Sequence, residues 1–442
     1  MNMIPKETVA YLDNYIIGQD KAKRTIALAL RSRHRRMQLS QELQDEIMPK
    51  NILMIGSTGV GKTEISRRLA KMMNLPFIKV EASKFTEVGF VGRDVESMIR
   101  DLVVTSIRLV KNEYQEKNES AIEAYILNKI VEKLLPPLPS LANESKKEEY
   151  KASKERMKEK VLSGAMDERI IEIEIPKMSI EFNDTNMPPD MAKVQESFSK
   201  IFSSFSKENT KKEIRVKEAK IALRHEASEK LLDMDAITKE ALKRAEQGGI
   251  VFLDEIDKIA VSSKSEGRND PSKEGVQRDL LPIVEGSTVT TKYGAVKTDH
   301  ILFIAAGAFH KVKPSDLIPE LQGRFPLRVE LESLTEEVLY KILSQTKNSL
   351  LKQYEALLGV EDVQLEFDES AVKAMAHLSQ KANEKTEDIG ARRLHTVLEK
   401  VLEDISFDAD IYRGQKVVVD ADLVHEKLDI IIEDEDTSRY IL

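Results

Sequence analysis

A glycine-rich segment followed by lysine and threonine is the part of this sequence best suited to chemistry. Residues 56–63 read Gly-Ser-Thr-Gly-Val-Gly-Lys-Thr. The glycines let backbone N–H groups turn toward an anion, Lys62 can reach the β- and γ-phosphates of a nucleotide, and Thr63 can bind the Mg²⁺ that bridges them. A plain strand-turn-helix connection would need neither Lys62 nor Thr63. The pattern therefore predicts a phosphate-binding loop for ATP and Mg²⁺.

A second chemical motif follows another apolar run. Residues 250–253 read Ile-Val-Phe-Leu, and Asp254 and Glu255 come directly after them. This is a Walker B pattern. Asp254 can hold Mg²⁺ through water, and Glu255 can polarise the water that attacks the nucleotide.

Short apolar strands and a helix must position these groups. We expect a helix to begin near Lys62, because Ile65 and Leu69 keep helical spacing. A strand-helix-strand unit around a phosphate loop predicts a parallel sheet covered by helices, which is an α/β fold. The expected strands are residues 52–55, 76–81, 250–254, 300–307 and 325–331.

The spacing of the two motifs predicts additional domains. Roughly 190 residues separate Thr63 from Asp254, whereas one strand-helix-strand crossover needs only ~30. Much of this insertion is rich in Lys and Glu and reads as solvated helix, although residues 169–175 alternate like a strand. After a helix capped by Thr335, the rest of the chain reads as a mainly helical domain with one short strand near residues 417–419.

Composition excludes several classes of protein. With 442 residues the chain is long enough for two or three domains, and it has no cysteine for disulfides, thiolate zinc sites or thiol nucleophiles. Neither a membrane-spanning run nor a secretion signal is present, so we expect a cytoplasmic location. A net charge of −8 argues against a protein that coats nucleic acid. The basic run at residues 31–36 either contacts nucleic acid or is a solvated helix face, and the second interpretation is favoured.

Two segments leave alternatives open. The sequence Gly89-Phe90-Val91-Gly92 indicates an exposed loop that grips a partner, or a loop whose Phe90 folds back into the core. At the end of the chain, four acidic residues precede Ser438-Arg439-Tyr440-Ile441-Leu442. This apolar terminus either folds onto its own domain or docks on another protein.

Taken together, these motifs resemble the AAA+ ATPases and, within them, the Clp/Hsp100 unfoldases, over essentially the whole chain. The features that carry the resemblance are both nucleotide motifs, the large insertion and four short segments, namely residues 16–20, 319–324, 390–394 and 438–442. The resemblance implies an AAA+ nucleotide-binding domain at residues 1–110 and 244–332, an inserted, mostly helical intermediate domain at 111–243, and a helical C-terminal domain at 333–442.

The resemblance also implies roles for individual residues. It implies a homohexamer with ATP bound between subunits, in which Arg324 is the arginine finger that reaches a neighbour's γ-phosphate and Arg392 is the sensor-2 arginine. Ile17 would line the adenine pocket, and Glu320 would lie near the nucleotide. The phosphates would be held by Gly59, Val60, Gly61, Lys62, Thr63 and Glu64, with Asp254 and Glu255 serving Mg²⁺ and hydrolysis.

Two positions depart from the family pattern. Phe90 stands where the pore loop usually has Tyr, which keeps an apolar tip but removes a hydroxyl. After the strand at 301–304 the chain reads Ala305-Ala306-Gly307, so no polar sensor-1 residue is assigned.

The function implied by the resemblance is ATP-driven unfolding and translocation of proteins. The pore loop would grip unfolded or tagged substrates, and the terminal segment 438–442 would dock on a separate proteasome-like peptidase, because the chain shows no proteolytic constellation of its own. No membrane or nucleic-acid partner is expected. The alternative is a nucleic-acid remodelling AAA+ ATPase. A nucleotide-binding scaffold without turnover is disfavoured by Glu255.

Overall fold

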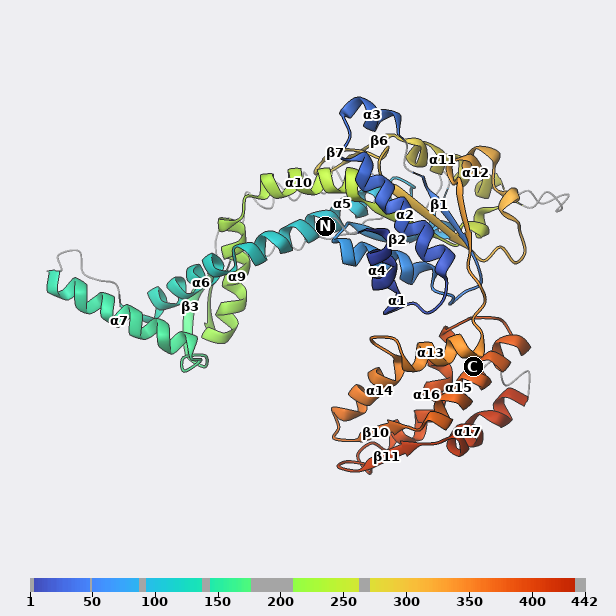
Figure 1. The fold of residues 1–442 in the computed structure, drawn as a ribbon. Helices are drawn as coiled ribbons and strands as arrows, with labels where there is room; N and C mark the ends of the chain where they lie inside the picture. The colour runs from blue at the N-terminus through green and yellow to red at the C-terminus, as the bar shows by residue number, and fades with distance from the viewer. Residues whose placement is uncertain are drawn as a thin grey trace. The chain divides into compact units, whose positions relative to one another are not determined.

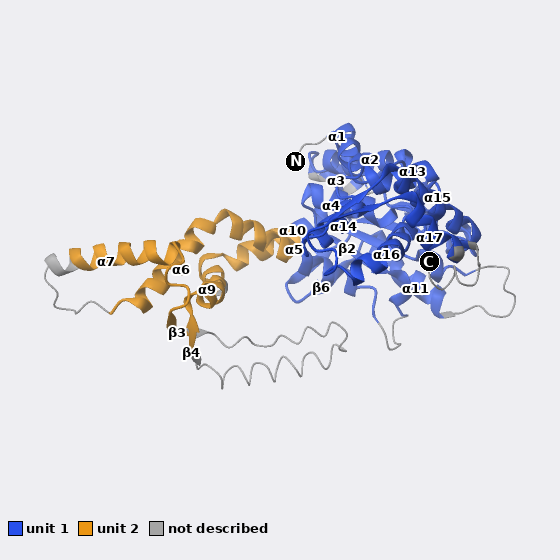
Figure 2. Ribbon diagram, turned by 90° about the horizontal axis from the view of Figure 1, so that it is seen from below, with its two compact units in different colours: residues 1–105, 244–442 blue, residues 106–243 orange. Residues whose placement is uncertain are grey.

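A computed structural model describes residues 4–47, 50–86, 93–136, 144–175, 210–261 and 271–433 of the chain. The chain forms two compact units, residues 1–105 with 244–442, and residues 106–243 (Figure 2). The loop residues Gly89, Phe90, Val91 and Gly92 lie outside the described residues, as does the terminal segment 438–442. Their proposed roles therefore stay predictions.

A five-stranded parallel sheet is the framework of the first unit, in the order β2-β5-β8-β1-β9. Alternate residues of its central strands are buried on opposite faces, so helices cover both sides of the sheet. The α/β fold class predicted from the sequence is confirmed. The strands are β1 (Ile52–Ile55), β2 (Phe77–Glu81), β5 (Ile250–Asp254), β8 (Leu302–Gly307) and β9 (Leu327–Glu330).

Helices before and after β1 pack against one face of the sheet. Ile26 and Leu30 of one helix and Ile65 and Leu69 of another share a buried cluster with strand residues such as Phe252. The predicted helix start at Lys62 is confirmed. The helices of this part of the chain are α1 (Pro5–Asp13), α2 (Asp20–Arg36), α3 (Gln41–Glu46) and α4 (Lys62–Met73) (Figure 1).

Helices and a two-stranded hairpin connect the later strands of the sheet. The hairpin formed by β6 and β7 was absent from the prediction, because its strands are only four residues long and carry little apolar pattern. These elements are η1 (Ala82–Lys84), η2 (Ile256–Ile259), α11 (Pro271–Glu285), β6 (Thr288–Thr291), β7 (Gly294–Lys297), η3 (Pro314–Asp316) and α12 (Pro319–Arg324).

The last part of the first unit is mainly helical and has its own buried cluster. Thr335 caps its first helix as predicted, accepting a hydrogen bond from the backbone N–H of Val338. The predicted single strand here pairs in parallel with a second one that the prediction missed. The elements are α13 (Glu336–Ser344), α14 (Leu350–Gly359), β10 (Gln364–Phe367), α15 (Glu369–Lys385), α16 (Arg392–Phe407), β11 (Lys416–Val419) and α17 (Ala421–Glu433).

The second unit consists mostly of helices around a small apolar cluster. Two long helices carry the chain into and out of it, and they are joined by a hydrogen bond of 2.7 Å from Ser106 Oγ to the carbonyl of Ala241. The strand predicted at residues 169–175 is present and pairs antiparallel with a second one. The elements are α5 (Ser97–Lys117), α6 (Glu119–Leu134), α7 (Glu144–Leu162), β3 (Ile170–Ile175), β4 (Thr210–Arg215), α9 (Val216–Leu231) and α10 (Met234–Gly248).

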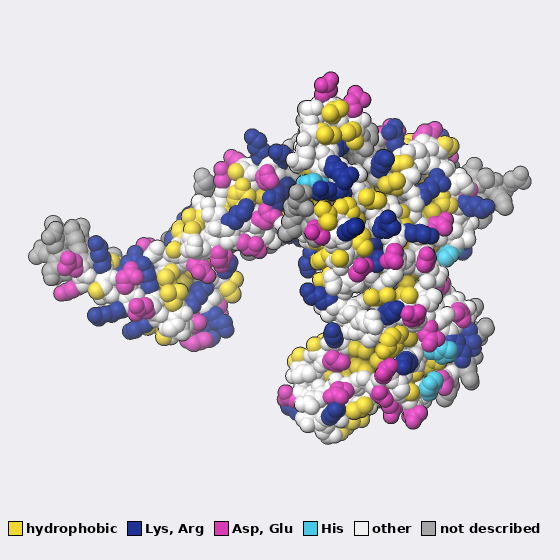
Figure 3. All heavy atoms as spheres, in the orientation of Figure 1, with side chains coloured by type: hydrophobic (Ala, Val, Ile, Leu, Met, Phe, Trp, Pro, Cys, Tyr) yellow, Lys and Arg dark blue, Asp and Glu magenta, His cyan; other side chains and the backbone are white. Residues whose placement is uncertain are grey.

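On the face of the second unit seen in Figure 3, basic and acidic side chains lie side by side along α6 and α7. The basic run at residues 31–36 lies at the C-terminal end of α2. Arg33 and Arg36 are buried there, and Arg33 Nη1 donates a 2.9 Å hydrogen bond to the carbonyl of Gly249. Burial, together with the nearby Arg36, lowers the pKa of Arg33 to about 9. Arg35 is exposed, so the expected solvated helix face is right only in part, and the burial of Arg33 and Arg36 weakens the sequence feature that favoured nucleic-acid binding.

Across the described ranges, every helix is too short or too polar to cross a membrane.

Candidate active site

The phosphate loop connects β1 to α4 with the geometry that an anion needs. Gly59 and Gly61 have φ angles of +79° and +102°, a backbone conformation that side chains with a Cβ rarely adopt. Lys62 is 9% exposed, and its Nζ donates to the carbonyl of Gly56 and, at 2.6 Å, to that of Ser57. Burial lowers the pKa of Lys62, while Asp254 and Asp257 oppose the shift. The lysine therefore lies among acidic groups at the start of a helix.

The two acids of the second motif lie at the carboxyl end of β5. Asp254 forms an ion pair of 2.7 Å with Lys79, which is on the adjacent strand β2. Glu255 is exposed and has a φ of +56°, an uncommon value for a residue with a side chain. Its Oε2 accepts a 3.0 Å hydrogen bond from Ser83 Oγ in η1. The turn directs Glu255 away from the sheet and toward solvent, where an attacking water can reach it.

One cavity of about 980 Å³ brings both motifs together. Asp254 and Glu255 line it together with the phosphate loop, and Arg392 and His395 of α16 also line it. A volume of this size accommodates a nucleotide triphosphate group with its water. The predicted site residues that line it are Gly59, Gly61, Lys62, Thr63, Glu64, Asp254, Glu255 and Arg392.

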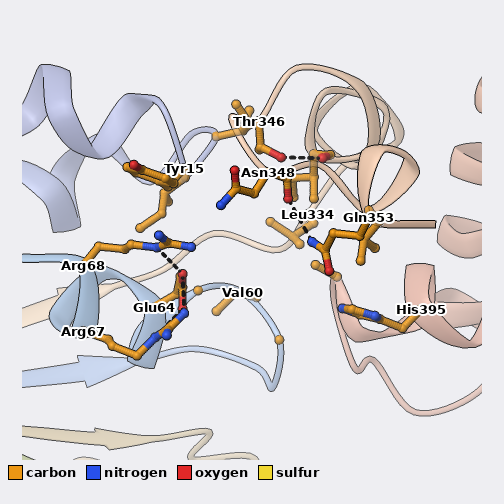
Figure 4. A pocket seen from close by; sticks show the side chains of 17 residues that line it. Tyr15, Val60, Glu64, Arg67, Arg68, Leu334, Thr346, Asn348, Gln353 and His395 are labelled. Carbon is orange, nitrogen blue, oxygen red and sulfur yellow. Dashed lines mark hydrogen bonds and ion pairs between the residues drawn. The ribbon is translucent and has the colours of Figure 1, made fainter. Parts of the chain in front are cut away.

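A second cavity of about 360 Å³ adjoins the same loop and is mostly apolar (Figure 4). It contains the predicted Ile17 together with Val60 and Glu64, and its far wall comes from α13, α14 and α16. Apolar side chains together with polar groups that can form hydrogen bonds suit a flat heterocyclic base. The apolar lining residues include Ile16, Ile17, Val60, Leu334, Ile342 and Leu350.

Charged and aromatic groups hold the near wall of the second cavity. The guanidinium of Arg68 lies 4.1 Å from the centre of the Tyr15 ring, a cation–π contact. Glu64 accepts hydrogen bonds from Arg67 and from Arg68, the latter at 2.6 Å (Figure 4). Partial burial acts to raise the pKa of Glu64, but these hydrogen bonds outweigh it and hold the pKa below its ordinary value. Glu64 therefore organises the wall as a carboxylate.

Oxygen donors suited to Mg²⁺ are present in the larger cavity. The Thr63 hydroxyl and the Asp254 carboxylate both line it, and hard oxygen ligands are what Mg²⁺ prefers. Among the described residues there is no group of three or more His, Cys, Asp or Glu side chains that could hold a metal alone. A cation here would take its remaining ligands from water and phosphate, as Mg²⁺ commonly does.

Two predicted site residues lie apart from both cavities. Glu320 and Arg324 are exposed on α12 and are absent from the described residues that line the cavities. Arg324 Nε donates a 2.9 Å hydrogen bond to Glu285 at the end of α11. The roles expected for Glu320 and Arg324 at the nucleotide of a neighbouring subunit therefore stay predictions.

Sequence reasoning missed a direct contact between the phosphate loop and the segment before α16. Ser57 Oγ donates a 2.9 Å hydrogen bond to Asp388 Oδ2, and the backbone N–H of Ala391 donates to the carbonyl of Gly59 at 3.2 Å. The contact joins positions more than 300 residues apart. Only the glycine at position 390, beside the arginine pair 392–393, marked this segment in the sequence.

Comparisons with known proteins find both family models and full-length relatives of this chain. Residues 52–130 match the ATPase family associated with various cellular activities (AAA), and residues 175–328 match the AAA domain of the Cdc48 subfamily. A Campylobacter jejuni protein named ATP-dependent protease ATPase subunit HslU is 64% identical over 442 residues, covering 100% of both chains. Its namesake from Helicobacter pylori is 63% identical, covering 100% of this chain and 99% of that protein.

Proposed function

Because this chain belongs to the HslU family of ATP-dependent protease ATPase subunits, we propose that it is the motor of a two-component protease, hydrolysing ATP to unfold proteins and thread them into the HslV peptidase. The observation that carries the proposal is the cavity in which Lys62, Asp254 and Glu255 meet. Peptide cleavage belongs to HslV. The nucleic-acid alternative is not favoured, since the buried Arg33 and Arg36 are unavailable to phosphates.

In this proposal ATP spans the two cavities. The base enters the apolar cavity beside Ile17, and the phosphates lie on the loop from Gly59 to Glu64, near the positive end of α4. Thr63 and Asp254 would hold Mg²⁺, which would offset the negative charge of the phosphates when it is bound. Lys62 offsets negative charge on the phosphates in the ground state.

Hydrolysis requires a base and an added positive charge. Glu255, held by Ser83, accepts a proton from the attacking water. Arg324 of an adjacent subunit offsets charge on the γ-phosphate, with Glu320 close by, and Arg392 does so from within the same chain. Because Arg324 acts on the site of the next subunit, hydrolysis requires an assembly, and we propose that this assembly is the homohexamer.

Two short segments handle protein rather than nucleotide. Residues 89–92 grip an unfolded or tagged substrate through Phe90, and residues 438–442 dock on HslV. In the sequence, the intermediate domain at 111–243 is inserted between the two segments of the nucleotide-binding domain, 1–110 and 244–332. The C-terminal domain begins at residue 333. We place the protein in the cytoplasm.

The experiment that tests this function combines the purified chain with HslV and a stably folded fluorescent reporter carrying a degradation tag. We expect loss of fluorescence only with ATP, Mg²⁺ and both proteins. Glu255→Gln is the matched control, because it keeps the shape of the site and removes the base. Degradation that proceeds equally without ATP, or equally with the Gln variant, would contradict the proposal.

A further inference from the structure

The phosphate loop is bonded to the 386–391 loop, the segment from Thr386 to Ala391 that leads into α16. Asp388 uses both carboxylate oxygens, accepting from Ser57 Oγ at 2.9 Å and from the backbone N–H of Gly390 at 2.9 Å. A second hydrogen bond joins the loops where Ala391 N–H meets the carbonyl of Gly59. The two loops are therefore linked at two points along their length.

Glycine residues at two facing positions allow the phosphate loop and the 386–391 loop to lie this close together. A Cβ added to Gly59 would lie 1.9 Å from the carbonyl oxygen of Ile389, and one added to Gly390 would lie 2.7 Å from that of Thr58. Both distances are shorter than real Cβ contacts permit. Backbone lies directly against backbone, so a side chain at either position would push the two loops apart.

The 386–391 loop is also held firmly to its own domain. The buried guanidinium of Arg393 donates to Asn383 at 3.1 Å, to Thr386 Oγ1 at 2.7 Å and to the carbonyl of Glu387 at 2.9 Å. The amide of Asn383 in turn donates to the carbonyl of Gly390. Because Arg392 follows this loop immediately and begins α16, a displacement of the loop also moves Arg392.

Charge makes Asp388 different from the other groups in this contact. Its carboxylate and the phosphate-binding Lys62 line one cavity, and Asp388 favours the charged form of that lysine. A bound triphosphate brings several negative charges to the same lysine. Like charges a few ångströms apart in a partly buried site repel one another with little screening by salt.

We propose that Asp388 is an electrostatic latch. Bonded to Ser57, it joins the 386–391 loop to the phosphate loop and opposes the charge of incoming phosphates. Phosphates on the loop repel the carboxylate, release the Ser57 contact and shift the 386–391 loop together with Arg392. Asp388 is thus a positioning residue that reports phosphate occupancy to the C-terminal domain, an inference that rests on the proposed nucleotide site.

Asp388→Asn tests the charge without removing the contacts. The Asn side chain has the same shape, its carbonyl oxygen can accept from Gly390, and its amide can donate to Ser57 Oγ. Calorimetric titration with AMP, ADP and ATP, each with Mg²⁺, should show affinity unchanged for AMP and raised for ADP and ATP, on the order of three- to tenfold for ATP. The gain should shrink at high salt.

Two further variants separate a latch from a general effect of charge. Glu387→Gln removes one negative charge from the neighbouring exposed residue of the same loop, and we expect it to change ATP affinity less than Asp388→Asn. Ser57→Ala frees the carboxylate to move away, so it should raise ATP affinity alone but add nothing in the Asp388→Asn background. This non-additivity is the signature of one shared contact.

Hydrogen exchange provides a readout that is independent of affinity. Adding ADP should speed exchange at the N–H groups of Gly390 and Ala391 in the unmodified chain, whereas Ser57→Ala should show fast exchange there without nucleotide. Equal affinities for Asp388→Asn and the unmodified chain, or equal changes for AMP and ATP, would overturn the latch while leaving ATP binding established. An unmodified chain that binds no ATP would overturn the proposed function and the latch with it.

Discussion

Ser83 Oγ donates a 3.0 Å hydrogen bond to Oε2 of Glu255, across the boundary between two adjacent strands of the sheet. Because Glu255 is exposed and its backbone has a positive φ, this bond fixes the direction of the carboxylate. We predict that Ser83→Ala lowers kcat for ATP hydrolysis by about tenfold, the size expected for losing a hydrogen bond to a charged group. Nucleotide affinity should not change.

Ser83→Thr is the matched control, since it keeps the hydroxyl and should retain most of the activity. The measurement is steady-state ATPase kinetics together with a binding titration for each variant. If Ser83→Ala loses nucleotide affinity in proportion to kcat, the serine supports the fold of the site rather than the orientation of Glu255.

Variants in the two motifs should affect nucleotide binding and ATP turnover differently. Glu255→Gln is expected to bind ATP nearly as tightly as the unmodified chain and to lose about 10²- to 10⁴-fold in kcat, because the base is gone. Lys62→Ala should lose much of the binding itself, since the buried ammonium offsets ground-state phosphate charge. Binding titrations and single-turnover kinetics distinguish the two, and an equal loss of affinity in both variants would contradict these roles.

How much of this site could be predicted depended on whether its parts are contiguous in the chain. The phosphate loop and the Asp254–Glu255 pair each occupy a few consecutive residues, so local spacing was sufficient to identify them. The contacts of Ser83 with Glu255 and of Lys79 with Asp254 require β2 to lie beside β5. Strand order is not encoded in local periodicity, and the two strands are separated by the whole second unit.

Other features of the site were not predicted for the same reason, because their parts are distant in the sequence. The far wall of the smaller cavity comes from residues between Leu334 and Gln353 and from His395. Their helical spacing predicts burial but not the element that they face. The Ser57–Asp388 pair joins the first and last parts of the chain. Strand β10 was missed because Gln364–Phe367 is too short for alternation to stand out from its helical surroundings.

Arg324 should act on a neighbouring subunit. Within one chain it is exposed and paired with Glu285 at 2.8 Å, and exposed pairs of this kind contribute little stability, so the arginine can leave at little cost. Mixed assemblies of Arg324→Ala and Lys62→Ala subunits should regain part of the ATPase activity that each variant lacks alone, because some interfaces combine an intact pocket with an intact finger. Mass spectrometry would verify that the rings are mixed. If such rings recover no ATPase activity, the assignment is refuted.

The terminal residues should carry the signal to the peptidase. Deleting Arg439 to Leu442 is expected to leave ATPase activity and assembly unchanged and to abolish activation of HslV. Burying Tyr440, Ile441 and Leu442 in a partner can supply roughly 1.5–3 kcal/mol per side chain before ordering costs, and several tails would act together.

The isolated peptide of residues 438–442 provides the complementary measurement. At high concentration it should partly stimulate HslV without ATP, and a scrambled peptide of the same composition should not. A truncated chain that activates HslV as well as the full chain does would show that the apolar terminus serves its own domain instead.

The hydrogen bond from Ser106 Oγ to the carbonyl of Ala241 has a consequence for how this chain can be cut and rejoined. It brings together the point where the polypeptide enters the second unit and the point where it leaves. A fragment of residues 106–243 would therefore have adjacent ends, which is the arrangement found in domains that can be transplanted or circularly permuted. The remaining 1–105 and 244–442 segments would need only a short linker to become one continuous polypeptide. The second unit could then be deleted from the gene and produced as a separate protein. Circular dichroism of both products would measure how fully each retains its helices.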